Sequence, residues 1–341
     1  MKLLTLGEAL AQAHDDPKKR HVLLGNGFSR ACLNDTFAYD ALKSRADLSK
    51  LSQTGWRAFD ALGTSDFEVV MRALSNASKL AQVYEGNGSQ LAQLFAEDAE
   101  ALKTVLIDAI ARSHPDHPFE IEADRYASCK VFLANFHHIY TLNYDLLLYW
   151  ALMRSEIPPL VPCDDGFRKP DDDENAGYVV WEPDSVKSQN VHYLHGGLHL
   201  FDSGSQLQKY TWVNTGERLI QQVRDAMARD LLPVFVSEGS SEQKLSRIRH
   251  SAYLSRAERS LYSLGNTLFV FGHSMADSDG HILRAIRRSK LTRLFVGIFG
   301  DPQLQANQQI VTRTIHLADG RSKTRPLEVQ FYDAQSAVVW G

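Results

Sequence analysis

The chain has 341 residues, of which 44% are hydrophobic and 10% aromatic, enough for one large α/β domain with an insertion or for two smaller domains. Its 37 lysines and arginines nearly balance 41 aspartates and glutamates, so net charge does not draw the whole molecule to nucleic acid or a membrane. It has no run of about 18 apolar residues, and its first residues lack the pattern of a signal peptide. We therefore expect a soluble, cytoplasmic protein without a membrane partner.

Strand candidates are short runs of apolar and β-branched residues. They fall at residues 21–24, 138–141, 191–194, 234–236, 268–272, 294–299 and 327–332. Between them lie helical patterns, such as Leu254, Ala257, Leu261 and Leu264 at spacings of three, four and three. This alternation in the C-terminal half predicts an α/β fold, a mostly parallel sheet covered by helices.

Two segments stand apart from this alternation. Residues 51–125 contain no convincing strand, and a helical period predicts a helical insert that begins at a capping box of Ser65 and Glu68. Residues 162–190 begin with an acidic, proline-punctuated stretch and are predicted to form a solvated surface loop. In the segment at 51–125, the apolar residues with the helical period are Leu91, Leu94, Phe95, Ala99, Leu102, Val105, Leu106 and Ile110. The remaining residues, 1–50 and 126–341, are predicted to form one discontinuous domain.

A glycine turn follows the first predicted strand. Gly25, Asn26, Gly27 and Ser29 lie where a backbone without side chains could approach a pyrophosphate and offer it free amides. The third glycine of the usual dinucleotide fingerprint is missing, so an ordinary turn from strand to helix is the alternative.

The second predicted strand ends in Thr141-Leu142-Asn143-Tyr144-Asp145. Open α/β sheets bind ligands at the carboxyl ends of their strands, which makes Asn143 and Asp145 candidate site residues. The alternative is that these polar residues only cap the apolar helix that follows.

The third motif is His195-Gly196-Gly197, again at the end of a predicted strand. A histidine at this place could take a proton near neutral pH or hold a ribose hydroxyl, and the glycines would let a substrate come close. Of the 13 histidines, we single out His195 alone, because it directly follows a predicted strand and precedes two glycines, as expected at a strand end. A purely structural histidine remains the alternative.

The fourth motif runs from Gly272 to Asp279 and follows the apolar strand at 268–272. Its amides and the Ser274 hydroxyl could bind a phosphate or ribose, and Asp277 or Asp279 could bind hydroxyls. Helix capping by either aspartate is the alternative. Their D-x-D spacing also suggests calcium, but the other ligands of a calcium loop are missing.

Basic residues gather in two places where they could contact the phosphates of a nucleic acid or a partner. A solvated face without a partner is the alternative. The residues are Lys244, Arg247, Arg249, Arg256, Arg259, Arg284, Arg287, Arg288, Lys290 and Arg293.

Taken together and in this order, the motifs GNGFS, TLNYD, HGG and GHSMADSD resemble the sirtuin-like family, in particular its bacterial branch of NAD-consuming proteins, several of which act in antiphage defence. The resemblance implies a Rossmann-like NAD-binding domain with Asn143 beside the nicotinamide ribose, His195 as the catalytic histidine and Asp145 supporting the same pocket. The residues expected to contact NAD are Gly25, Asn26, Gly27, Ser29, Thr141, Gly196, Gly272, Ser274 and Asp277.

The chain departs from lysine-deacylating sirtuins, because it lacks their four zinc-binding cysteines and their Asp-Phe-Arg segment. Its three cysteines, Cys32, Cys129 and Cys163, form no C-x-x-C pair, so we expect neither a disulfide framework nor a bound metal. Deacylation is therefore not expected. The resemblance implies hydrolysis of NAD to nicotinamide and ADP-ribose, with an NAD sensor and an ADP-ribosyltransferase left open. It also implies a homo-oligomer and a defence partner such as an ATPase.

Overall fold

The computed structural model describes the chain except for residues 1, 14, 34–50, 53–54, 65–66, 87–88, 113–114, 116, 172, 174–175, 184–187, 211–217, 230 and 237–239. The expected helix cap Ser65 and the acidic residues Asp172 and Glu174 therefore lie outside the described residues. Among the helices of the described ranges, none has the length and apolar character needed to cross a bilayer.

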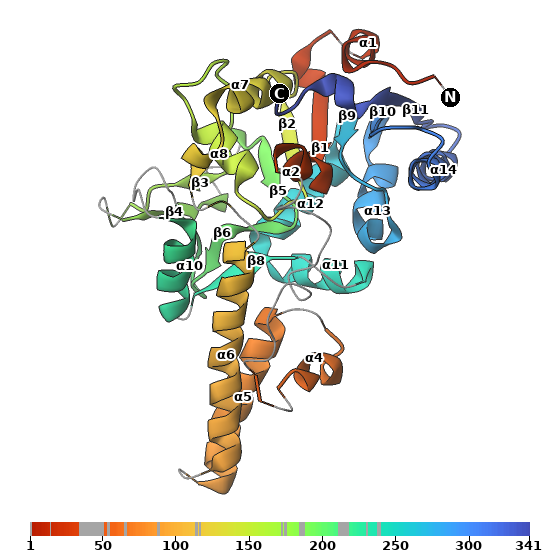
Figure 1. Cartoon of the computed structure of the whole chain (residues 1–341). Coiled ribbons are helices and arrows are strands. Elements are labelled where there is room, and N and C mark those ends of the chain that lie inside the picture. Colours follow the sequence, from red (N-terminus) through yellow and green to blue (C-terminus); the bar gives the residue numbers. More distant parts are fainter. Residues whose placement is uncertain are drawn as a thin grey trace.

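A six-stranded sheet forms the centre of the molecule, with the order β11-β10-β9-β1-β2-β5 and parallel pairing throughout (Figure 1). Counted along the chain, these strands stand in the spatial order 3-2-1-4-5-6, which is the order of the Rossmann fold. The predicted mostly parallel α/β fold is confirmed. The strands are β1 (Arg20–Leu24), β2 (His138–Thr141), β5 (Val191–Tyr193), β9 (Gly265–Phe271), β10 (Lys290–Ile298) and β11 (Glu328–Asp333).

The core lies on both faces of this sheet, because successive residues of a strand point to opposite sides. Val22 and Leu24 of β1 belong to one apolar cluster, whereas Leu23 between them belongs to the other. The first face is covered by α1 (Leu6–Gln12), α2 (Asn26–Cys32), α7 (Ala123–Leu133) and α8 (Leu147–Met153). The second is covered by α12 (Ala252–Ser263), α13 (Gly280–Arg288) and α14 (Gln305–Asp319). Such two-sided burial explains why the parallel strands are near-continuous apolar runs.

The segment at 51–125 is helical and carries no strand among its described residues. Its two long helices pack against each other as a hairpin that projects from the rest of the chain (Figure 1). The buried stripe of the second helix includes Leu102, Val105 and Leu106, as the period predicted. The helices are α4 (Arg57–Ala61), α5 (Phe67–Glu85) and α6 (Gln90–Arg112), followed by the short turn η3 (Pro118–Glu120).

A second, five-stranded sheet has antiparallel pairing and the order β3-β4-β7-β6-β8. The sequence predicted only the strand at 234–236 of this sheet, and placed it among parallel strands. Two further helices, α10 (Leu219–Ala228) and α11 (Ser241–His250), follow in this half of the chain. The strands are β3 (Phe167–Arg168), β4 (Tyr178–Trp181), β6 (Gly196–Asp202), β7 (Leu207–Tyr210) and β8 (Leu232–Phe235).

The acidic stretch after residue 162 is not simply a solvated loop, since β3 and β4 lie between residues 162 and 190. Asp165 forms an ion pair of 2.5 Å with Lys209, and both side chains are largely buried. Asp164 pairs with Arg168 at 2.7 Å, and the hydrogen bond from Arg168 lowers the pKa of the Asp164 carboxyl. These two aspartates were expected to face solvent, but their charges are instead paired at the second sheet. The division of the chain into domains stays a prediction.

Candidate functional site

The carboxyl ends of four parallel strands lie in one row. Leu24 at the end of β1 is in register with Phe271 of β9 on one side and Thr141 of β2 on the other. Thr141 is in turn in register with Tyr193 of β5. The four sequence motifs begin directly after these residues, so the register brings their loops to one edge of the sheet. The gap between β1 and β9 is the point where the strand order reverses, which is where open α/β sheets bind ligands.

The glycine turn packs against the loop that follows β9. The Gly25 amide donates to the Phe271 carbonyl at 2.9 Å, and the Gly27 amide donates to the Gly272 carbonyl at 2.8 Å. The expectation that these amides are free for a pyrophosphate is therefore wrong. A Cβ on Gly27 would lie 2.5 Å from the Gly272 Cα, and Gly272 has a φ of +70°. The glycines are needed here because two backbones meet.

Replacement of Gly27 by alanine should destabilise the protein by about 1–3 kcal/mol, because the added methyl group would overlap with the backbone of Gly272, which cannot move away as a flexible side chain could. The midpoint of urea unfolding measures this change. Gly7→Ala is the matched control: Gly7 lies exposed in α1 with only a distant contact, so alanine should leave stability unchanged or raise it slightly. A Gly27→Ala protein as stable as the wild type would show that the two loops are not in close contact.

Asn143 is held by the glycine turn. Its Nδ2 donates to the Gly25 carbonyl at 3.0 Å and to the Ser29 hydroxyl at 2.8 Å, and its side chain is buried. A carbonyl oxygen can only accept, so the amide group that faces Gly25 must be the nitrogen. Both of its hydrogens are then used. What Asn143 can offer a ligand is its Oδ1, a hydrogen-bond acceptor.

Asp145 is joined to Asn143 through Ser29. One carboxylate oxygen accepts from the Ser29 hydroxyl and the other from the Leu147 amide at 2.9 Å, so Asp145 also caps α8. Burial raises the pKa of Asp145 to about 6, against the hydrogen bonds from Ser29 and Leu147 that favour the carboxylate. The capping alternative thus holds for Asp145, and through Ser29 the same carboxylate fixes Asn143.

His195 faces a second histidine. Its Nε2 lies 3.0 Å from the Nε2 of His281, at the start of α13, and both rings are buried. Burial lowers the pKa of His195 to about 3 and that of His281 to about 4. Both imidazoles are therefore neutral at pH 7. A backbone hydrogen bond connects this loop to the Asn143 loop, since the Leu194 amide donates to the Thr141 carbonyl at 2.9 Å.

Asp279, in the turn η5 (Asp277–Asp279), carries the negative charge of this region. It accepts from Lys244 at 2.8 Å and from His273 at 3.1 Å. Burial by itself would raise its pKa, but the hydrogen bond from His273 and the neighbouring positive charges outweigh burial and hold the pKa well below its usual range. Asp279 is therefore ionised at pH 7.

His195, Asp279 and His281 bring three potential metal-ligand atoms within 4.8 Å of one another. Two features fit a direct hydrogen bond better than a shared metal ion. The ring centroids of the histidines are 5.2 Å apart with the Nε2 atoms between them, so the rings meet nearly end to end. A metal ion bound by both histidines would need the lone pairs of the two Nε2 atoms to point at the same place beside the line that joins them, whereas here the two nitrogens face each other. The carboxylate is also already neutralised by Lys244.

The remaining predicted contacts divide into structural and open positions. The Thr141 hydroxyl accepts from the backbone amide of Asn143 at 3.0 Å. A Cβ on Gly196 would lie 2.0 Å from the Val234 carbonyl, so β8, rather than a substrate, approaches this glycine. Asn26 and Ser274 are partly exposed and Asp277 is exposed, which leaves all three accessible to a ligand.

A model of the family described as "Domain of unknown function (DUF4917)" matches residues 22–340. The chain belongs to the DUF4917 family. A search of curated proteins gave no match. Three similar solved structures are a Sir2 homologue mutant with ADP-ribose (13% identity, covering 92% of this chain and 96% of that one), a Sir2 homologue mutant with 2'-O-acetyl ADP-ribose (13%, 93% and 97%) and a Sir2 homologue with NAD (14%, 93% and 94%). Each has a TM-score of 0.33, so these are distant matches.

Sequence reasoning missed His273 and His281 of this DUF4917 chain. It selected His195 because that residue directly follows a strand. His273 also follows a strand, and the amide of Met275, which has a positive φ of 54°, donates to its Nδ1 at 3.1 Å. The same rule, applied to every histidine after a buried strand, would have found His273. His281 stands at a helix start and gave no comparable signal.

The basic residues do not form one free surface. Lys244 is buried and paired with Asp279, and Arg293 pairs with Glu328 at 3.0 Å. Burial lowers the pKa of Arg247 to about 10. Arg287 and Arg288 are exposed. Contact with a nucleic acid stays an open prediction.

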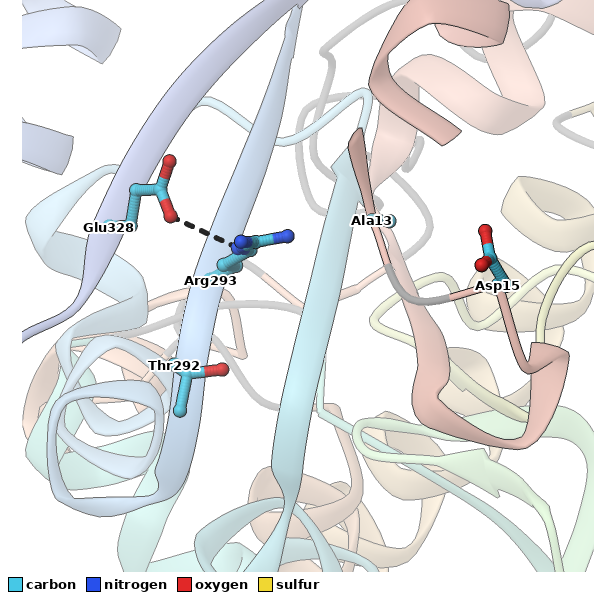
Figure 2. Close-up of a pocket in the computed structure, with 5 residues that line it drawn as sticks. All are labelled: Ala13, Asp15, Thr292, Arg293 and Glu328. Atoms are coloured by element: carbon cyan, nitrogen blue, oxygen red, sulfur yellow. Dashed lines mark hydrogen bonds and ion pairs between the residues drawn. The ribbon is translucent and has the colours of Figure 1, made fainter. Parts of the chain in front are cut away.

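One described pocket of the DUF4917 chain lies at the opposite edge of the sheet. It has a volume of about 400 Å³ and is lined by Ala13, Asp15, Thr292, Arg293 and Glu328. Figure 2 shows the Arg293 guanidinium turned toward the Glu328 carboxylate, which neutralises it. Because Arg293 and Glu328 lie in the amino-terminal parts of β10 and β11, this pocket is separate from the four motif loops.

Proposed function

We propose that the chain binds NAD at the carboxyl ends of β1, β2, β5 and β9 and hydrolyses its nicotinamide-ribose bond to nicotinamide and ADP-ribose. Three observations support this proposal. The strand order reverses between β1 and β9, and open α/β sheets bind ligands outside the carboxyl ends of their strands at such a point. The four motif loops follow neighbouring strands at this edge, and their sequences resemble the sirtuin-like family.

The orientation of Asn143 carries the proposal. Nicotinamide leaves NAD as a neutral base, and the ribose passes through a state with the character of an oxocarbenium cation. Such a cation is stabilised by fixed acceptors, not by donors. Asn143 has both amide hydrogens engaged with Gly25 and Ser29, so its Oδ1 is a fixed acceptor at this place. It suits a ribose hydroxyl or an attacking water.

His195 supplies the base in this proposal. The imidazole is neutral at pH 7 because burial lowers its pKa to about 3, so it has an unprotonated nitrogen available. It accepts a proton from the attacking water, whose oxygen bonds to the ribose carbon as the bond from that carbon to nicotinamide breaks, or it holds a ribose hydroxyl. A base of such low pKa is weak, so positioning contributes more to its effect than basicity does.

The second candidate function is an NAD sensor without hydrolysis. The burial of His195 favours it, since the residue is only 4% exposed and attacking water must reach its ring. An ADP-ribosyltransferase, the third candidate, uses the same bond cleavage but delivers ADP-ribose to a macromolecule. A role in bacterial antiphage defence, self-assembly and an ATPase partner belong to the proposal through the family resemblance alone.

The experiment is incubation of the purified protein with NAD labelled in its adenine, followed by separation of nicotinamide, free ADP-ribose and macromolecule. Equal release of nicotinamide and free labelled ADP-ribose is the expected result. Label in macromolecule would indicate transfer instead. Binding of intact NAD by calorimetry without nicotinamide release would favour the sensor, and absence of both binding and release would refute NAD as the ligand.

A further inference from the structure

The ring of His195 has two nitrogens, and the structure distinguishes them. Nε2 meets the Nε2 of His281 at 3.0 Å, end to end. Between two neutral imidazoles, a hydrogen bond requires that one nitrogen carries a proton and the other does not. The other nitrogen of His281, Nδ1, lies 3.4 Å from the Ser241 hydroxyl, which also accepts from Arg284 at 3.3 Å. His281 is thus held between His195 and α11.

We propose that His281 is a positioning residue that holds His195 as the tautomer protonated on Nε2, so that Nδ1 is the nitrogen that accepts a proton from the substrate or water. In this arrangement His195 donates from Nε2 to His281, and His281 donates from Nδ1 to Ser241. The opposite arrangement would place the His195 proton on Nδ1 and remove the base. The contacts with His281 and Ser241 hold His195 in one arrangement or the other, and the choice between the two rests on the proposed function, because only the first leaves Nδ1 unprotonated.

The charges around the two rings fit this role. When His195 takes a proton, an O–H bond breaks, an Nδ1–H bond forms and the ring becomes an imidazolium. Asp279 can stabilise that cation, because its carboxylate lies within 4.8 Å of the ligand nitrogens of both histidines. Lys244 and His273 fix the carboxylate by hydrogen bonds on its two oxygens. Two further charged groups lie on the Ser241 side of the network: Arg284, which donates to Ser241 at 3.3 Å, and Glu242, which lies 3.9 Å from Arg284.

The tautomer can be read directly by long-range proton–nitrogen NMR of protein labelled with ¹⁵N-histidine, with the His195 signals assigned by their loss in His195→Gln. The wild type should show a protonated Nε2 and an unprotonated Nδ1. The His281→Phe protein should show a mixture of both tautomers. A wild-type His195 protonated on Nδ1, or an unchanged single tautomer in His281→Phe, would overturn the proposal. No activity is needed for this measurement.

Steady-state kinetics test the consequence for catalysis. His281→Phe should lower kcat for NAD roughly 100-fold with little change in KM, because a wrong tautomer impairs the chemical step and not binding. His281→Gln should recover at least part of this loss, since its amide oxygen can accept from Nε2. His316→Phe, an exposed histidine of α14, is the control and should match the wild type.

Two results would separate this inference from its competitors. Stoichiometric zinc in the purified protein, lost in His281→Gln together with activity, would show a metal between the rings and refute the hydrogen bond. A wild type that lacks NAD cleavage but shows the expected tautomer, disturbed in His281→Phe, would refute the proposed function and leave the positioning role intact. Equal kcat in His281→Phe and an active wild type would refute the catalytic consequence.

Discussion

Replacement of Asn143 by alanine should lower kcat for NAD by roughly 100- to 1,000-fold, while the affinity for NAD changes little. The lost atom is Oδ1, the fixed acceptor that the hydrogen bonds to Gly25 and Ser29 leave available. An acceptor that acts on a developing cation stabilises the transition state more than the bound substrate. Nicotinamide release under saturating NAD and calorimetry of NAD binding measure the two quantities.

Ser29→Ala gives a graded comparison, because it keeps Asn143 but removes the hydroxyl that joins it to Asp145. Its kcat should fall about 10-fold, less than that of Asn143→Ala. Asn135→Ala is the matched control, since that asparagine only donates to carbonyls at the end of α7. Equal loss of NAD affinity and kcat in Asn143→Ala would mean that Asn143 serves binding alone, and wild-type kcat would remove it from the site.

The sequence predicted the strand ends well because parallel strands buried on both faces leave a strong signal. The runs at 21–24 and 138–141 end at Leu24 and Thr141, as in the structure, and the register then brings Gly25 and Asn143 together. The strand ends recognised in the sequence were therefore enough to place Asn143 and His195 at the carboxyl edge of the sheet. Their roles in catalysis stay predictions.

The partners of these residues could not be predicted, because they depend on contacts between distant parts of the chain. His281 reaches His195 across 86 positions, and Ser29 reaches Asp145 across 116. The second sheet was missed for a similar reason. Gly196 and Gly197 were expected to let a substrate come close, but β6 begins at Gly196, where glycine is required because the β8 backbone lies so close.

Acidification from pH 6.5 toward pH 4 should lower the free energy of unfolding by roughly 10 kcal/mol. Five histidines have their pKa lowered from 6.5 by burial, to about 3 or 4. In the unfolded chain they take up protons near pH 6.5, so between that pH and 4 the unfolded state binds more protons than the folded state. Each such histidine contributes a slope of about 1.4 kcal/mol per pH unit. The five are His21, His138, His192, His195 and His281.

Asp145 acts in the opposite direction but does not reverse the trend. Its folded pKa of about 6 lies above its ordinary value of 3.8, so in that window the folded state binds the proton first and acidification favours folding. Burial raises the pKa of Glu258 as well, but two carboxyls cannot offset five imidazoles. Urea unfolding at a series of pH values measures the slope. His192→Phe, which keeps an aromatic ring beside Tyr140, should reduce the slope by about one proton, whereas the exposed His316→Phe should not. A stability that stays constant between pH 6.5 and 4.5 would show that these imidazoles are accessible to protons in the folded protein, and the neutral His195 that the proposed mechanism requires would then be lost on mild acidification.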